Sequence, residues 1–404
     1  MLVANYKHFG GKHWETAAIK NTLAHAGVLA PHTGEPFSEA LCLGIAGGIG
    51  AGYSFCPSYV GQGFGGGITI VGRTLSYATD AEFYEGFFDR IGARTQITES
   101  TGPKAAYKNL RDALAAGNPV IVWCARFMLP YYGSDLHSCS MYSLVVHGVD
   151  EGAGVAYLAD RAATSLTIAL DDLEKARAQI CAHNNRTLTF DAPAKLTSAG
   201  LKDAVLEGIR ACTQSLLKPK IKTFSLEGVQ EWSKLITNGK NTKGWPKVYT
   251  GGKLYLALRD VYHSIETAGT GGSLYRNLYA EFLDEAGTIT KQKGFSDAAR
   301  HYRELGKAWS DLAETALPSK VKPFKETKEL LARRCRLFEE QGAEALDEIR
   351  SAGERLKALE SEIVAGFPLK SQETADLLEQ LRGRIVALHE SETKAIAALE
   401  RLVK

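Results

Sequence analysis

The chain has 404 residues, of which 45% are hydrophobic and 23% are charged. This is the composition of an ordinary folded protein, and the length favours two or more domains. Lysine and arginine total 48 against 46 for aspartate and glutamate, so the formal net charge is only +2. Such a balance argues against a nucleic-acid-binding protein and against binding to an anionic membrane surface.

Targeting features and cysteine usage place the protein in the cytoplasm. The sequence shows neither the charged start and apolar run of a signal peptide nor the roughly 18 apolar residues of a membrane-spanning helix. The seven cysteines are odd in number and form no CxxC pair, which favours reduced thiols over disulfides. His8, His13 and Glu15 match no standard metal-ligand spacing. We therefore expect a cytoplasmic protein with no membrane segment, no metal and no cofactor.

The first 195 residues alternate predicted helices with predicted strands. Two of the strands should pair as a hairpin through the turn at 151–154. The pattern predicts an α+β domain with a small, mainly antiparallel sheet. The expected helices cover 15–27, 38–46, 80–92, 107–116 and 171–182, and the expected strands cover 68–71, 119–124, 143–150 and 155–160.

A glycine-dense segment at 44–52 resembles a phosphate-binding loop only superficially. It follows a predicted helix instead of a strand, and no Lys-Ser/Thr pair or ribose-binding acid follows it. Both features are needed for the usual nucleotide motifs. We therefore expect these glycines to serve close backbone packing.

Beyond about residue 200 the chain is predicted to be helical throughout. Apolar residues recur at helical spacing from Leu346 to Ile363, and again from Leu377 to Leu402 after a break at Gly366-Phe367-Pro368. This predicts an all-α region that ends in a long helical hairpin. Its apolar stripes can be covered by the chain's own domain, the more common arrangement, or by a second copy in a homodimer. We expect domains at 1–195, 196–318 and 319–404, the first boundary being the place where the composition changes.

The segment from His8 to Tyr53 carries the strongest functional signal. A glycine turn leads into a helix whose first turn contains His13, Trp14 and Glu15, the position at which papain-like folds present a nucleophile. The segment resembles the butirosin biosynthesis protein H N-terminal family, an acyltransferase family with a papain-like (cysteine-protease-like) fold. The family pattern has cysteine where this chain has Trp14.

The resemblance extends to two further elements. In papain-like folds a histidine opens a strand like the one expected at 143–150, and alignment on Gly148 and Asp150 puts Tyr142 at that place. Asp160 matches the acid that orients the histidine, and Arg161, which follows it, is a candidate for binding substrate. His147 lies on the same strand, and alternation predicts that its side chain points away from the side of Tyr142. The resemblance thus implies a catalytic set in which Trp14 and Tyr142 replace the Cys/His dyad, with His13, Glu15 or His147 as the remaining bases.

Other residues are candidates for binding substrate. Ser38 and Glu39 match an S-E pair of the family, although helix capping explains them equally well. Cys124 and Cys139 flank the expected cleft and are the only plausible substitutes for the missing thiol, while a buried structural cysteine is the more common case. Residues 268–286 resemble the helical domain of unknown function that follows the butirosin H type domain. Arg276 in this segment either binds an anion or belongs to a helix connection.

Three functions are compatible with these residues. The resemblance implies an amide-forming acyltransferase that takes an acyl group from a carrier protein or thioester and passes it to an amine. Without the dyad, such an enzyme would have to act by positioning both reactants, which can lower a barrier substantially. The second reading is a degenerate papain-like protein that binds a small molecule, peptide or carrier domain. A peptidase is the weakest of the three candidate functions, because peptide hydrolysis most needs the absent Cys/His dyad.

Overall fold

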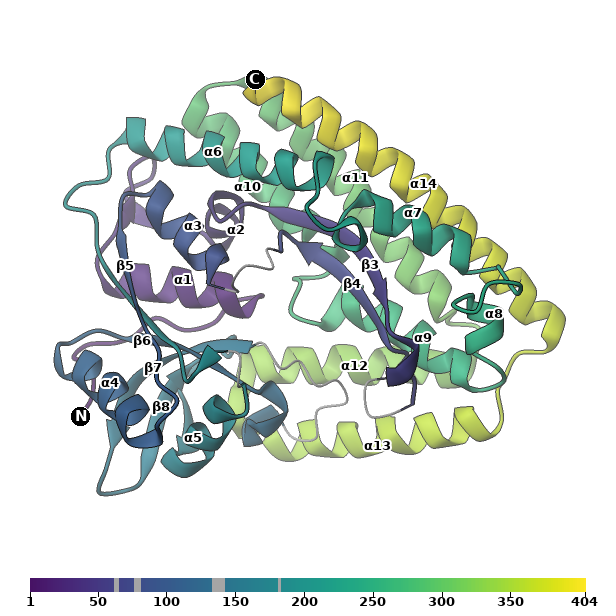
Figure 1. Cartoon of the computed structure of the whole chain (residues 1–404), viewed down its shortest axis with the longest axis horizontal. Helices are drawn as coiled ribbons and strands as arrows, with labels where there is room; N and C mark the ends of the chain where they lie inside the picture. Colours follow the sequence, from purple (N-terminus) through teal and green to yellow (C-terminus); the bar gives the residue numbers. More distant parts are fainter. Residues whose placement is uncertain (62–64, 76–80, 133–141, 181–182) are drawn as a thin grey trace. The chain divides into compact units, whose positions relative to one another are not determined.

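The computed structural model describes residues 1–61, 65–75, 81–132, 142–180 and 183–404 (Figure 1). Its contacts divide the chain into two compact units. Unit 1 contains residues 1–42, 78–204 and 336–353, and unit 2 contains residues 43–77, 205–335 and 354–404. The units thus interleave along the chain, whereas the sequence predicts three consecutive domains, and those boundaries stay a prediction.

Unit 1 is the α+β part expected from the sequence. Its sheet has six strands in the order β5-β10-β6-β7-β8-β9, and every pairing is antiparallel. The strands are β5 (Arg94–Thr98), β6 (Val120–Cys124), β7 (Tyr142–Asp150), β8 (Val155–Ala159), β9 (Leu166–Ala169) and β10 (Thr187–Asp191); the helices are α1 (Trp14–His25), α3 (Glu82–Arg90), α4 (Pro103–Ala115) and α5 (Leu170–Ala178); and short elements are β1 (Leu29–Ala30), β2 (Glu35–Pro36), η2 (Arg126–Met128), η3 (Pro130–Tyr132) and η8 (Gly342–Ala345).

The central strands explain the position of the core. All residues of β6 and all but the last of β7 are buried, as expected of strands covered on both faces. Helix α1 packs against β7. The predicted hairpin is confirmed, since β7 and β8 pair from Val145 opposite Ala159 to Asp150 opposite Val155. This arrangement brings the first turn of α1 and the start of β7 into one part of the unit.

Unit 2 is mainly helical, as predicted. A two-stranded antiparallel sheet accompanies its helices. The strands within the unit are β3 (Ile49–Phe55) and β4 (Ile68–Arg73), and its helices are α7 (Leu226–Leu235), α8 (Trp245–Val248), α9 (Lys253–Tyr262), the π-helix η6 (His263–Thr267), α10 (Arg276–Thr290), α11 (Lys293–Ala316), α14 (Ser371–Val403) and the short η1 (Pro57–Tyr59), η5 (Lys222–Phe224) and η7 (Ser273–Tyr275). Four further helices have residues in both units: α2 (Glu39–Ile45), α6 (Ser198–Leu217), α12 (Lys322–Gln341) and α13 (Leu346–Ala365).

The glycine-dense segment contains a strand that the sequence does not predict, because β3 begins at Ile49 and pairs with β4. The expected close packing is nevertheless present. A Cβ atom at Gly50 would lie 2.1 Å from the carbonyl oxygen of Arg73, so only glycine fits there. The glycines serve the packing of unit 2.

The long C-terminal helices and the break between them are confirmed. Helix α13 ends at Ala365 and α14 begins at Ser371. Helix α14 runs alongside α7 and α11 (Figure 1), and its apolar stripe from Leu377 to Leu399 is buried there. The chain itself covers this stripe, so the stripe gives no indication of a second copy, and the homodimer stays a prediction. None of the described helices is both long and apolar enough to cross a bilayer.

Candidate functional site

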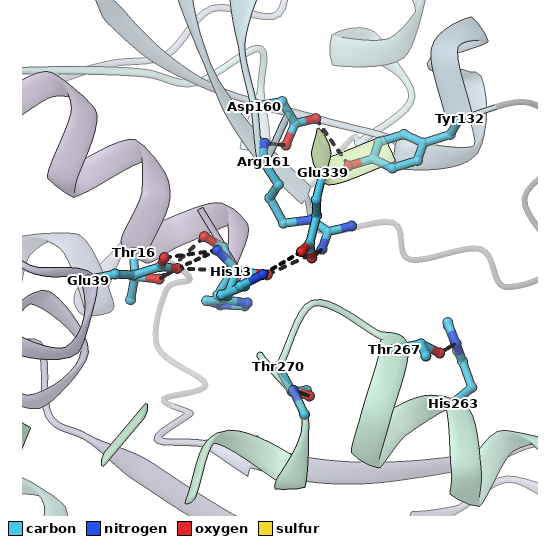
Figure 2. Close-up of polar contacts among 12 residues, drawn as sticks. His13, Thr16, Glu39, Tyr132, Asp160, Arg161, His263, Thr267, Thr270 and Glu339 are labelled. Carbon is cyan, nitrogen blue, oxygen red and sulfur yellow. Dashed lines mark hydrogen bonds and ion pairs between the residues drawn. The ribbon is translucent and has the colours of Figure 1, made fainter. Parts of the chain in front are cut away.

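A carboxylate holds the N-terminus of α1. The Glu39 side chain accepts hydrogen bonds from the backbone N–H groups of Lys12 (2.8 and 2.9 Å) and His13 (2.8 Å), and from the Thr16 hydroxyl (2.7 Å), as Figure 2 shows. A negative charge at this end of a helix satisfies orphan donors and complements the helix dipole. Ser38 meanwhile caps its own helix, since its Oγ accepts from Leu41 N (2.9 Å). Both residues therefore have structural roles.

The glycine turn that precedes α1 tolerates no side chain. A Cβ atom at Gly11 would lie 2.4 Å from the Cβ of Ala17 and 3.2 Å from Glu39 Oε2. We expect Gly11→Ala to lower the free energy of unfolding by about 1–3 kcal/mol, because it overpacks the helix entry. Gly102→Ala, at the start of α4 with nothing within 4 Å of the added atom, is the control. Equal urea midpoints for the two variants would contradict this packing.

The candidate bases of the first turn are buried. His13 is completely buried and Glu15 is 3% exposed, and His13 Nε2 lies 3.0 Å from Glu15 Oε2. Trp14, which opens α1, is half-buried. Its ring centroid lies 3.9 Å from that of His13 and 5.1 Å from that of Tyr142. The structure therefore brings together the two residues that the sequence places at the dyad positions.

Tyr142 also contacts the predicted orienting acid. Its hydroxyl donates to Asp160 Oδ1 at 2.5 Å, and Arg161 N donates to the same oxygen at 2.7 Å. The hydroxyls of Tyr131 and Tyr132 both donate to Asp160 Oδ2 at 3.2 Å. We call Tyr131, Tyr132, Tyr142 and Asp160 the tyrosine cluster. No sequence signal indicated that the Tyr131 and Tyr132 hydroxyls would both contact this carboxylate.

Burial determines the protonation of the tyrosine cluster. It raises the pKa of Tyr142 well above 10, and the nearby Asp160 charge adds to the effect. Burial also raises the pKa of Asp160, although the Tyr142 hydrogen bond and the Arg161 charge oppose this shift. The guanidinium of Arg126 lies 4.5 Å from the Tyr132 ring centroid. The Tyr142 phenol is thus a neutral hydrogen-bond donor at physiological pH.

Arg161 links the α1 entry to a distant part of the chain. Its Nη1 donates to the carbonyl of Lys12 (3.2 Å) and to Glu339 Oε1 (3.0 Å), and Lys12 Nζ pairs with Glu339 Oε2 at 2.7 Å (Figure 2). Arg161 is 3% exposed, which fits a positioning role better than direct contact with a substrate. No sequence signal identified Glu339, because it lies on α12, within a helical stretch of ordinary charged residues.

His147 lies apart from the tyrosine cluster. Its ring stacks on Tyr6 (4.6 Å between centroids) and contacts Phe9 (5.6 Å), and its Nε2 lies 2.9 Å from Ser165 Oγ. Burial lowers its pKa to about 4. His147 therefore belongs to an aromatic packing group, and these contacts do not include Trp14 or Tyr142.

The lowered pKa of His147 predicts an acid-sensitive contribution to stability. His147 binds a proton near pH 6.5 in the unfolded chain and only near pH 4 in the folded chain. The stability that neutral His147 contributes is therefore present above pH 6.5 and is lost as the pH falls towards 4. We expect the difference in unfolding free energy between wild type and His147→Gln to shift by up to about 3 kcal/mol between pH 7 and 4. The control is His301→Gln, at an exposed position. A pH-independent difference would contradict the assignment.

The remaining predicted site residues lie elsewhere or have other partners. Cys124 is completely buried in β6, directly opposite Tyr142 in the sheet. Cys139 lies outside the described residues. Arg276 is in unit 2, completely buried, and its Nε donates to Glu392 Oε1 at 2.7 Å. Among the described residues, no three His, Cys, Asp or Glu side chains gather as a metal ion would require.

Comparison with known families agrees with this geometry. The model of the butirosin biosynthesis protein H N-terminal family matches residues 13–161, from the start of α1 to the residue after Asp160. This part of the chain is similar to a butirosin H type domain. A domain of unknown function (DUF4872) matches residues 171–365. No curated protein matches the chain.

The family match confirms the resemblance and the fold class inferred from the sequence. The region that matches the butirosin H model contains Trp14, Tyr142 and Asp160. The DUF4872 match follows it along the chain, as expected from the sequence. The sheet of unit 1 and the helices that follow are consistent with a papain-like domain joined to a helical region.

Proposed function

We propose that this protein binds an acyl thioester, free or on a carrier protein, together with an amine, and forms no acyl-enzyme. The observation that carries the proposal is the contact chain from Trp14 through Tyr142 to Asp160. An acyl-enzyme needs a nucleophile with a base beside it and an acid that orients the base. Here the orienting contact is present, while an indole and a phenol occupy the other two positions.

Neither replacement can perform the covalent step. An indole offers only an N–H donor. The buried Tyr142 phenol stays neutral and donates a hydrogen bond to Asp160. A neutral phenol is too weak a base to take a proton from a nucleophile. Cys124 is completely buried and therefore out of reach of a bound thioester. The chemistry of the site thus supports binding more strongly than turnover.

Trp14 is the part of the site best suited to contact a ligand. It is half-buried, whereas Tyr142 and Asp160 are buried beneath the surface. The indole provides a rigid apolar face for an acyl chain. Direct transfer from thioester to amine is the second candidate function. The family match favours it, and it requires only that both reactants be held in place.

Titration of the full-length protein with a panel of acyl thioesters, with and without amines, tests the proposal. We expect saturable binding in calorimetry, at least tenfold weaker for Trp14→Ala and unchanged for Tyr59→Ala, which removes an exposed aromatic side chain of unit 2. Absence of binding across the panel would overturn the proposal. Amide product without any change in protein mass would establish direct transfer.

A further inference from the structure

The break between α13 and α14 forms one wall of a pocket in unit 2. The other walls come from α8, from the start of α9 and from the residues between them, at the right of Figure 1. The pocket has a volume of about 580 Å³, and sites for small molecules commonly have about 300–1,000 Å³. All of its lining residues belong to unit 2. The pocket is therefore a feature of that unit alone.

The lining of the pocket is largely apolar, and its edge is open to solvent. The buried side chains of Tyr249, Leu254 and Leu378 line it, together with the half-buried Phe367 and Leu369 of the break. Apolar surface that stays partly accessible in a concave site is typical of a place where a ligand binds. A ligand can reach this surface because several lining residues are exposed, namely Pro246, Thr250, Ser371 and Ala375.

The walls of the pocket are held in place by contacts within unit 2. The Tyr249 ring packs edge-on against that of Trp245, with 5.2 Å between centroids, and its hydroxyl donates to the carbonyl of Gly66. The start of α9 lies against the end of α13, because a Cβ atom at Gly252 would clash with the carbonyl oxygen of Val364. A pocket with fixed walls loses little conformational freedom when a ligand binds.

The polar groups of the pocket offer hydrogen-bond donors without an unbalanced charge. The hydroxyls of Thr237, Thr250 and Ser371 line the pocket and make no hydrogen bond to any residue that the structure describes. Of the described lining residues, Glu379 alone is charged, and its Oε2 accepts from Arg382 Nε at 2.7 Å. A charged ligand would thus lose its hydration here without gaining an opposite charge, which is costly.

We propose that this pocket binds an uncharged, mainly apolar small molecule that carries an oxygen acceptor such as a carbonyl group. The apolar lining favours burial of the body of such a molecule, and the open hydroxyls can donate to its oxygen. The aromatic rings of Tyr249 and Phe367 suit a flat ring system. Because the pocket lies within unit 2, the inference does not rest on the function proposed for Trp14.

Fluorescence titration of the full-length protein with prodan, a neutral naphthyl ketone whose emission shifts to the blue in apolar surroundings, tests the pocket. We expect a saturable blue shift with micromolar affinity. Ala375→Phe fills the pocket from an exposed position of α14 and should weaken binding at least tenfold. Ala387→Phe, at an exposed position of the same helix outside the pocket, should leave binding unchanged. Circular dichroism verifies that both variants fold.

Two competitors of matched shape test the class of ligand. Methyl naphthyl ketone and naphthoate differ by a methyl group in place of a charged oxygen, and the ketone should displace prodan at a concentration at least tenfold lower. The double variant Thr237→Val/Thr250→Val removes two donors without a change of shape. It should weaken binding of the ketone at least threefold.

Four outcomes would overturn the inference. They are the absence of a saturable shift, equal effects of the two alanine substitutions, equal displacement by the ketone and the carboxylate, and a loss of binding confined to Trp14→Ala, which would place the probe in unit 1. None of these results depends on an acyl thioester. A failure here therefore leaves the proposed function untouched, and the reverse also holds.

Discussion

Replacement of Asp160 by alanine is expected to lower the free energy of unfolding by about 3–5 kcal/mol. The change removes the acceptor of three buried tyrosine hydroxyls and of Arg161 N. Each buried donor left without a partner costs about 1–3 kcal/mol, although Tyr132 and Tyr142 can still bond each other, since their oxygens lie 2.5 Å apart. Urea unfolding followed by circular dichroism measures the loss.

Two further variants make this prediction specific to the tyrosine cluster. Tyr142→Phe removes one donor and should cost about 1–2 kcal/mol. In a double-mutant cycle with Asp160→Ala, the two changes should be strongly non-additive, because they remove the same contact. Asp89→Asn at an exposed position of α3 should stay within about 0.5 kcal/mol of wild type. Additive losses would mean that Tyr142 and Asp160 do not interact.

Arg276→Met should destabilise the protein by a similar amount, about 3–5 kcal/mol, because it leaves Glu392 as a buried charge without its cation. Arg276 and Glu392 are 0% and 1% exposed. Arg276 also donates to the carbonyls of Leu274 (2.7 Å) and Gly50 (2.9 Å). The variant therefore also loosens η7 and strand β3. Urea unfolding is again the measurement.

The double variant Arg276→Met/Glu392→Leu separates the charge from the backbone contacts. Replacing both partners of a buried ion pair by apolar residues is often nearly neutral. Here we expect only partial recovery, because the carbonyls of Leu274 and Gly50 still lack their donor. Arg300→Met, whose partner Asp297 lies on an exposed helix surface, should change stability by less than about 1 kcal/mol. An Arg276→Met variant no less stable than this control would contradict the structural role.

The sequence was most informative where chain neighbours determine the outcome. The strand pattern and the turn at 151–154 were sufficient to predict the β7–β8 hairpin. The pairing of these two strands then brings Asp160 close to Tyr142. The family pattern placed Trp14 at the first turn of α1, opposite the position of Tyr142 in the site. The ring contact between Trp14 and Tyr142 agrees with this placement. Both inferences rest on local spacing.

Contacts between distant segments could not be predicted in this way. Glu339 reaches Lys12 and Arg161 from more than 170 positions along the chain, and nothing in its helix marks it. Glu39 caps α1 instead of its own helix, which depends on tertiary packing. Strand β3 was missed because its glycines indicate a turn, whereas in the fold they permit close approach of β4.

Intact-mass spectrometry after exposure to an acyl thioester tests the central claim most directly, namely that the papain-like site persists without its covalent step. The wild-type mass should stay unchanged, whereas Trp14→Cys/Tyr142→His, which restores a thiol and an imidazole beside Asp160, should gain one acyl group on the peptide that contains residue 14. Trp14→Cys alone should react more slowly, because its thiol lacks a base. An acyl adduct on the wild-type chain, absent from a Cys124→Ala or Cys139→Ala variant, would contradict the account.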